Sequence, residues 1–145
     1  MHAFPKIGEE IRGIAFAPDG KTVAAAGDSI HLYDAATGTE RFRIDRKART
    51  LVFSQDGRTL LSTNDDGTVT VWDAGSATPR ETLRGHSASH AVLSRDGETL
   101  YTVSEDGTAI TWDLTGGRRL GRSFMFTRDR GVDEISDGYP GRFSP

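Results

Sequence analysis

The sequence predicts an all-β chain made of three consecutive four-stranded antiparallel meanders. One pattern recurs three times, with copies that start at Gly13, Thr50 and Ala91. Each copy places Asp-Gly pairs between apolar runs, which is the strongest short-range signal for a hairpin. The chain also has 17 glycines among 145 residues and no long helical apolar stripe. These features are typical of many short strands joined by turns.

Two independent markers give the register of the repeat. One marker is the apolar residue that ends the first strand, and its copies are Phe16, Phe53 and Leu93. The other marker is an aromatic residue followed by aspartate, and its copies are Tyr33-Asp34, Trp72-Asp73 and Trp112-Asp113. Both markers recur at nearly the same spacing, so they share one period.

The elements of each unit follow in a fixed order. The first strand ends at an Asp-Gly turn, where glycine permits the positive φ of a tight reversal. The second strand, 59–64 in the second unit, runs into another Asp-Gly turn at 66–67, as its counterpart does at 106–107. The third strands, 68–72 and 108–112, are rich in β-branched and aromatic residues, as strands packed on both faces are. The more polar segments 39–44, 79–83 and 118–124 predict a fourth, exposed edge strand.

These motifs resemble WD repeats. The marks of that family are Phe-Ser-x-Asp-Gly, the second Asp-Gly turn and Trp-Asp, at a period of roughly 40 residues. The resemblance covers residues 11 to about 124. It implies β-propeller blades at about 11–45, 48–85 and 88–124. The fold class is therefore expected to be an incomplete ring of three propeller blades.

The WD-repeat resemblance also implies a buried hydrogen-bond network in each blade. It links a histidine of the incoming loop, a Ser or Thr of the second strand, the Trp of the third strand and an Asp of the turn. In the third unit the matching residues are His86, Thr102, Asp106 and Trp112. The loop after His86 is about two residues shorter than the usual pattern, so His90 is an alternative.

The other two units match this network less well. The second unit has Ser62, Asp66 and Trp72 at the same offsets, but Arg46-Lys47 stands where the histidine is expected, so an incomplete network is predicted. In the first unit Tyr33 replaces the Trp, Ala24 replaces the hydroxyl and the turn at Asp28 is one residue shorter. We therefore expect the first blade to be the weakest.

The segment 125–145 is expected to be a polar loop followed by the first strand of a truncated fourth repeat at Phe143-Ser144-Pro145. Propellers have roughly four to eight blades, so three blades leave open edges. The expected explanations are a fragment of a longer product, or a homo-oligomer in which copies complete a ring through these edges. The stretch from Trp112 to Phe124 also resembles large WD-repeat regulatory proteins of high-GC Gram-positive bacteria, which implies a signalling role.

Composition excludes several classes of function. The 18 basic and 21 acidic residues give a net charge of -3, which argues against a nucleic-acid partner. The absence of cysteine excludes disulfides, thiolate metal sites and cysteine nucleophiles. No stretch approaches the roughly 18 apolar residues of a membrane span, and no membrane partner is expected. A cytoplasmic location agrees with these features.

The leading functional hypothesis is a non-catalytic scaffold that binds other proteins, without a cofactor or metal. Candidate contacts are Arg46, Lys47, Arg49 and the 125–140 segment, although such charges are more often simply solvated. The alternative is part of a propeller enzyme of lactonase or hydrolase type. The sequence offers no group of catalytic residues for this alternative. The four histidines are scattered, and the aspartates that precede glycines are explained by turns.

Overall fold

The computed structural model describes residues 8, 10–85, 87–116, 118–126 and 132–136. Thirteen strands occur in this part of the chain, and no helix does. The strands are β1 (Gly13–Phe16), β2 (Thr22–Ala26), β3 (Ile30–Asp34), β4 (Glu40–Ile44), β5 (Ala48–Phe53), β6 (Thr59–Asn64), β7 (Val69–Asp73), β8 (Thr78–Leu83), β9 (Ala88–Leu93), β10 (Thr99–Ser104), β11 (Thr108–Asp113), β12 (Arg118–Phe126) and β13 (Val132–Ser136). The all-β fold class is confirmed.

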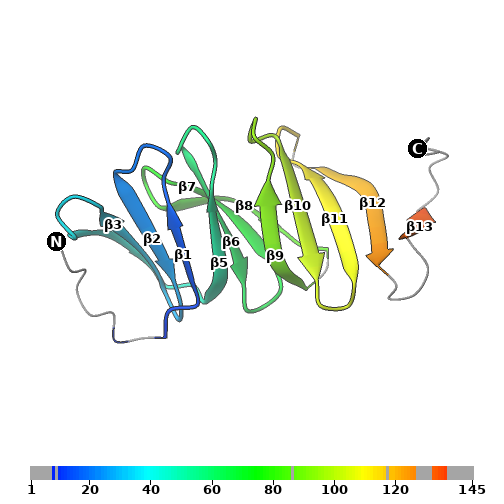
Figure 1. Cartoon of the computed structure of the whole chain (residues 1–145), viewed down its shortest axis with the longest axis horizontal. Coiled ribbons are helices and arrows are strands. Elements are labelled where there is room, and N and C mark those ends of the chain that lie inside the picture. Colours follow the sequence, from blue (N-terminus) through cyan, green and yellow to red (C-terminus); the bar gives the residue numbers. More distant parts are fainter. Residues whose placement is uncertain (1–7, 9, 86, 117, 127–131, 137–145) are drawn as a thin grey trace.

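The strands form three antiparallel sheets that lie in an open row (Figure 1). Their orders are β1-β2-β3-β4, β5-β6-β7-β8 and β9-β10-β11-β12-β13. We call them blade 1, blade 2 and blade 3. Within the first two, sequence neighbours are spatial neighbours throughout, as the predicted meanders require.

Blade 3 differs from the prediction by one strand. β13 pairs antiparallel with β12, with Phe126 opposite Val132, inside a segment that was expected to be a loop. Its sequence, VDEIS, is too short and polar to give a periodic signal. The expected start of a fourth repeat at Phe143 lies outside the described residues.

Glycines with positive φ close the predicted hairpins. Gly20, Gly57 and Gly97 have φ of 69°, 71° and 76° in the turn after the first strand, and Gly67 and Gly107 have 82° and 88° in the turn after the second strand. Side chains rarely adopt this conformation, which explains why the repeat keeps glycine at these points.

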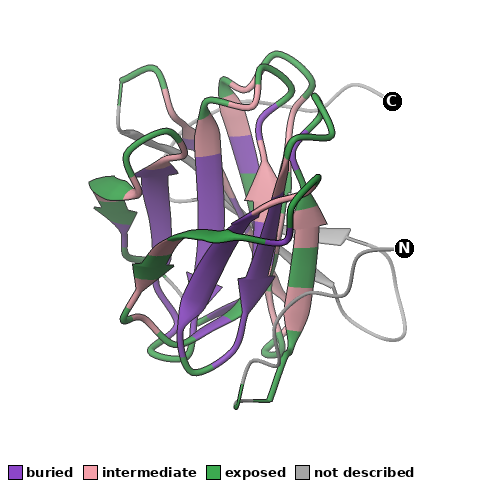
Figure 2. Ribbon diagram, turned by 90° about the vertical axis from the view of Figure 1, so that its left-hand side faces the viewer, coloured by how far each residue is buried: buried purple, intermediate pink, exposed green. Residues whose placement is uncertain are grey.

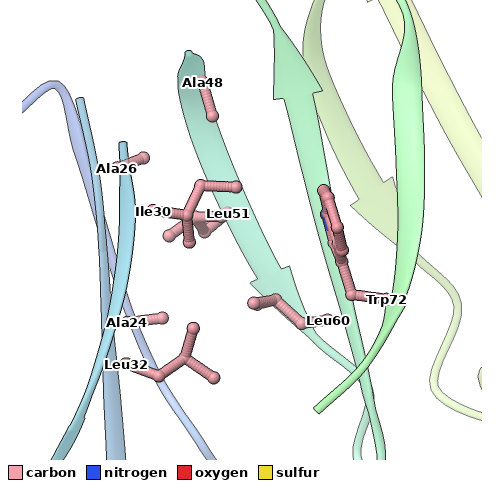
Figure 3. Close-up of a cluster of buried hydrophobic side chains, with 8 residues drawn as sticks. All are labelled: Ala24, Ala26, Ile30, Leu32, Ala48, Leu51, Leu60 and Trp72. Atoms are coloured by element: carbon pink, nitrogen blue, oxygen red, sulfur yellow. The ribbon is translucent and has the colours of Figure 1, made fainter. Parts of the chain in front are cut away.

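The core lies between the blades. One buried cluster joins Ile30 and Leu32 of blade 1 to Leu51, Leu60 and Trp72 of blade 2 (Figure 3). The second joins Leu61, Val69 and Val71 of blade 2 to Leu100, Ile110 and Trp112 of blade 3. Blade 2 thus buries alternate side chains of its strands against each neighbouring blade. Figure 2 shows the result, with buried strand segments and exposed turns.

The same backbone contact fixes both junctions between blades. The amide of Ala48 donates to the carbonyl of Gly27 at 3.0 Å, and the amide of Ala88 donates to that of Gly67 at 3.0 Å. In each case the first residue of an inner strand bonds to the turn glycine of the preceding blade. The inner strands β1, β5 and β9 therefore lie side by side along the row.

Candidate interaction surface

Blade 2 contains a buried chain of polar side chains. The indole N–H of Trp72 donates to Oγ of Ser62 at 2.9 Å, and Ser62 donates to Oδ1 of Asn64 at 2.8 Å. The amide of Asn64 then donates to the hydroxyls of Thr68 and Thr70, each at 2.9 Å. Sequence reasoning missed Asn64, because asparagine before an Asp-Gly pair is ordinarily interpreted as a turn residue.

Arg46 completes this network in place of a histidine. Its Nη2 lies 2.8 Å from Oδ2 of Asp66 and 3.0 Å from Oγ1 of Thr68. Asp66 also accepts bonds from Thr68, which lower the pKa of its carboxyl. The second network has no histidine, as its sequence indicates, and the guanidinium of Arg46 reaches from the loop to the turn instead.

Blade 3 contains a shorter version of the network. The indole N–H of Trp112 donates to Oγ1 of Thr102 at 2.9 Å. Asp106 accepts bonds from the amide and hydroxyl of Thr108 at 2.8 and 2.6 Å, so its role is to close the turn. His90 is exposed and lies 3.3 Å from Oγ of Ser89, away from Thr102. His86 lies outside the described residues.

Blade 1 replaces the network with packing. Val23 lies opposite Tyr33, as Leu60 lies opposite Trp72, so Ala25 rather than Ala24 occupies the position of Ser62. The turn is consequently two residues shorter than in blade 2. His31 stacks on Tyr33 with ring centroids 6.0 Å apart, and its Nδ1 is hydrogen-bonded to Glu40.

These network residues are mostly buried, which places any surface for a partner elsewhere. Ser62, Trp72, Thr102 and Trp112 are all buried. The predicted candidate contacts are paired within the chain: Arg46 with Asp66, Lys47 with Asp28, and Arg49 with Asp65. The side chains of the remaining candidate, the 125–140 segment, lie outside the part of the chain that the structure describes.

A cleft of about 540 Å³ crosses the junctions of all three blades. Its lining comes from the starts of the inner strands and the turns after the second strands: Arg12, Arg49, Thr50, Asp65, Ser89, His90 and Glu105. Arg49 lies at a register shift between Ala48 and Thr50, a bulge that re-aims its side chain. We call this feature the inner cleft.

The charges of the inner cleft are balanced and tied together. Asp65 accepts from Arg12 at 2.7 Å and from Arg49 at 3.1 Å, while Arg49 also lies 3.9 Å from Glu105. The hydrogen bond from Arg12 is the main cause that lowers the pKa of the Asp65 carboxyl. Two arginines and two carboxylates thus form a ladder from blade 1 to blade 3.

The opposite end of the sheets has a second hollow of about 450 Å³, beside the turns after the first strands of blades 2 and 3. There Ser54 and Ser94 donate to Asp56 and Asp96, which cap the turns and whose carboxyl pKa values are lowered by these bonds. These aspartates therefore serve the turns. Within the described ranges, no three His, Asp or Glu side chains are grouped to hold a metal, and no helix is long and apolar enough to cross a membrane.

Comparison with a family model identifies two repeats. The model described as "WD domain, G-beta repeat" matches residues 45–73 and 77–113. These two segments are therefore similar to WD40 repeats. Both matched ranges follow blade 1, in which Tyr33 and Ala25 replace the Trp and the hydroxyl of the other blades.

Known proteins support the same fold. The chain is 32% identical over 76 residues to the "U3 small nucleolar RNA-associated protein 18 homolog" of Arabidopsis thaliana, a match that covers 48% of this chain and 14% of that protein. It resembles the crystal structure of RRP9 WD40 repeats with a TM-score of 0.76 at 21% identity, over 81% of this chain and 39% of that one. It resembles the structure of U3-55K with a TM-score of 0.80 at 20% identity, over 87% and 42%.

The chain spans less than half the length of each of these proteins. The structural likeness shows the fold, that of consecutive blades of a WD40 propeller. The sequence relative is from a plant, so the comparisons give no support to the resemblance to bacterial regulatory proteins.

Proposed function

We propose that this chain is a non-catalytic scaffold that binds another protein at the inner cleft, as part of a larger signalling or regulatory protein. The observation that supports this most is that the cleft draws residues from all three blades: Arg12, Asp65 and Glu105 among them. Stacked blades hold such loops rigidly, so a partner meets a preformed surface. A cytoplasmic location remains a prediction.

The balanced charge of the cleft favours a polypeptide partner. Its two arginines are already engaged by Asp65 and Glu105, which leaves no unbalanced positive field to attract phosphates. The printed name of the plant relative includes RNA association. For this chain, an RNA partner is the alternative to a protein partner that the binding experiment below distinguishes. No observation on the described residues favours the enzyme alternative.

A displayed random-peptide library selected on the 145-residue chain tests this proposal. We expect selected peptides to lose at least about tenfold in affinity, or about 1.4 kcal/mol, when His90→Ala and Glu105→Lys are combined. Both side chains are exposed, so the fold is expected to persist.

The matched control combines Gln55→Ala and Arg95→Ala at the opposite hollow, and it is expected to leave peptide binding unchanged. Peptides that respond to the control pair and not to the cleft pair would contradict the assignment of the surface. RNA oligonucleotides that bind the cleft when no peptide does would contradict the protein partner.

A further inference from the structure

The two ends of the row expose apolar side chains. At the blade 3 end, Val92 is 64% exposed, Tyr101 49% and Val103 39%. At the blade 1 end, Ile14 is 61% exposed and Phe16 63%. Large apolar side chains gathered on a sheet face are a mark of an interaction surface.

The exposed residues of blade 3 occupy positions that are buried inside the row. Val92 lies opposite Tyr101 in blade 3, as Val52 lies opposite Leu61 in blade 2. Leu61 is only 1% exposed, because it packs in the cluster that blade 3 completes with Leu100 and Trp112. Val92 and Tyr101 therefore belong to a face that a following blade covers.

The exposed residues of blade 1 occupy the complementary positions. Phe16 lies opposite Val23 and Ile14 opposite Ala25, as Phe53 lies opposite Leu60 and Leu51 opposite Ser62. In blade 2, Leu51 and Phe53 belong to the cluster shared with blade 1. Ile14 and Phe16 thus belong to a face that a preceding blade covers.

The backbone offers the same match. The two junctions within the chain each join the amide of an inner-strand residue to the carbonyl of a turn glycine in the preceding blade. Ile11 stands two residues before Gly13, as Ala48 stands two residues before the equivalent Thr50, and Gly107 of blade 3 is equivalent to Gly67 of blade 2. A third junction of this kind would join Ile11 of one chain to Gly107 of another.

We propose that two copies of this chain associate head to tail, with blade 3 of each copy packed on blade 1 of the other. The occupant is a second copy, because the exposed faces of blade 1 and blade 3 repeat the two halves of the junctions that pack inside the chain. Such a heterologous contact, used twice about a twofold axis, closes a ring of six blades, within the roughly four to eight blades of propellers. Val23 and Tyr33 are already buried, so the contact is made mainly by β1 of one copy and by β9 and β10 of the other.

Light scattering coupled to size-exclusion chromatography tests the proposal on the 145-residue chain across concentrations. We expect the mass of two chains for the wild type and of one chain for Phe16→Lys and for Val92→Lys, because each substitution places a charge in both copies of the interface. Gln55→Lys, an exposed turn residue away from both faces, is the charge-matched control and should remain dimeric. Circular dichroism shows whether each variant remains folded.

The two variants together distinguish head-to-tail contact from face-to-face contact. Phe16→Lys alters only the blade 1 face and Val92→Lys only the blade 3 face, so head-to-tail contact requires both variants to lose the mass of two chains. A contact between two like faces would leave one of the variants dimeric. A monomeric wild type would overturn the proposal, and so would a folded variant of either kind that stays dimeric.

Discussion

At the scale of single residues, Trp112 tests whether blade 3 is packed as described. The side chain is 5% exposed and contacts the cluster between blades 2 and 3. Trp112→Ala should lower the free energy of unfolding by roughly 3 to 5 kcal/mol. Trp112→Phe keeps much of the apolar area but loses the bond to Thr102, and should cost about 1 to 3 kcal/mol. Urea denaturation measures both; a loss below about 1 kcal/mol for the alanine variant would show a peripheral tryptophan.

Asp65 gives the inner cleft a defined pH dependence. Its carboxyl pKa is lowered in the folded chain, chiefly by the hydrogen bond from Arg12, relative to an ordinary value of about 3.9. The ionised carboxylate therefore stabilises the fold above about pH 4, and this stabilisation is lost as the pH falls through the folded pKa.

The measurement compares melting temperatures of the wild type and Asp65→Asn across this pH range. We expect the wild type to melt higher at pH 7 and the difference to shrink as the pH falls below about 4 and the Asp65 carboxylate becomes protonated. The comparison isolates Asp65, because Asp66 and the other carboxylates with lowered pKa values are shared by both proteins. A difference that persists unchanged in acid would contradict the account.

The sequence predicted the tryptophan and the hydroxyl residue of the buried network in blade 2, but not the residues that link them to the turn. The offsets of Ser62 and Trp72 led to the observed hydrogen bond, because both positions belong to a repeated pattern. Asn64 and Arg46 escaped prediction because each belongs to blade 2 alone, and the side-chain reach that joins them to Thr68 exists only in the folded chain. The inner cleft escaped for the same reason, since its residues come from three separate repeats.

At the scale of elements, strands and turns were predictable where the repeat is regular. The Asp-Gly turns were located because glycine supplies their positive φ. The shorter turn of blade 1 was misjudged by one residue, since sequence spacing does not show which residues lie opposite each other across a hairpin. Ala77 was also missed: it has a φ of 55°, in the turn between β7 and β8, where blade 1 has Gly38 with a φ of 70°.

Ala77→Gly should therefore stabilise the chain. The left-handed conformation costs a non-glycine residue roughly 1 to 2 kcal/mol, which glycine relieves. The greater freedom of glycine in the unfolded chain offsets about 0.4 to 1 kcal/mol of this gain in stability. We expect a net gain of up to about 1 kcal/mol in thermal or urea denaturation. Ala36→Gly, in the equivalent turn of blade 1, is the control and should destabilise slightly, because Ala36 does not have a positive φ. Equal effects of the two substitutions would argue against strain at Ala77.

At the scale of the whole molecule, the regular period of the repeat was enough to predict three meanders in series, because each repeat is one hairpin-connected sheet. The pairing of β13 with β12 was not predictable, since that contact depends on a segment outside the repeat. The alternating apolar residues implied that one blade packs on the next. Only the folded structure shows which face of each blade packs against the preceding blade and which against the following one.

Hydrogen–deuterium exchange of the 145-residue chain, followed by mass spectrometry, tests whether three four-stranded blades follow one another along the chain. We expect three protected regions, β2–β3, β6–β7 and β10–β11, separated by fast-exchanging turns that include Gly57 and Gly97. At concentrations at which the chain is monomeric, the slowest amides should lie in β6 and β7, because only blade 2 is covered on both faces by blades of its own chain. Uniform rapid exchange, or one protected stretch that runs through these turns, would contradict it.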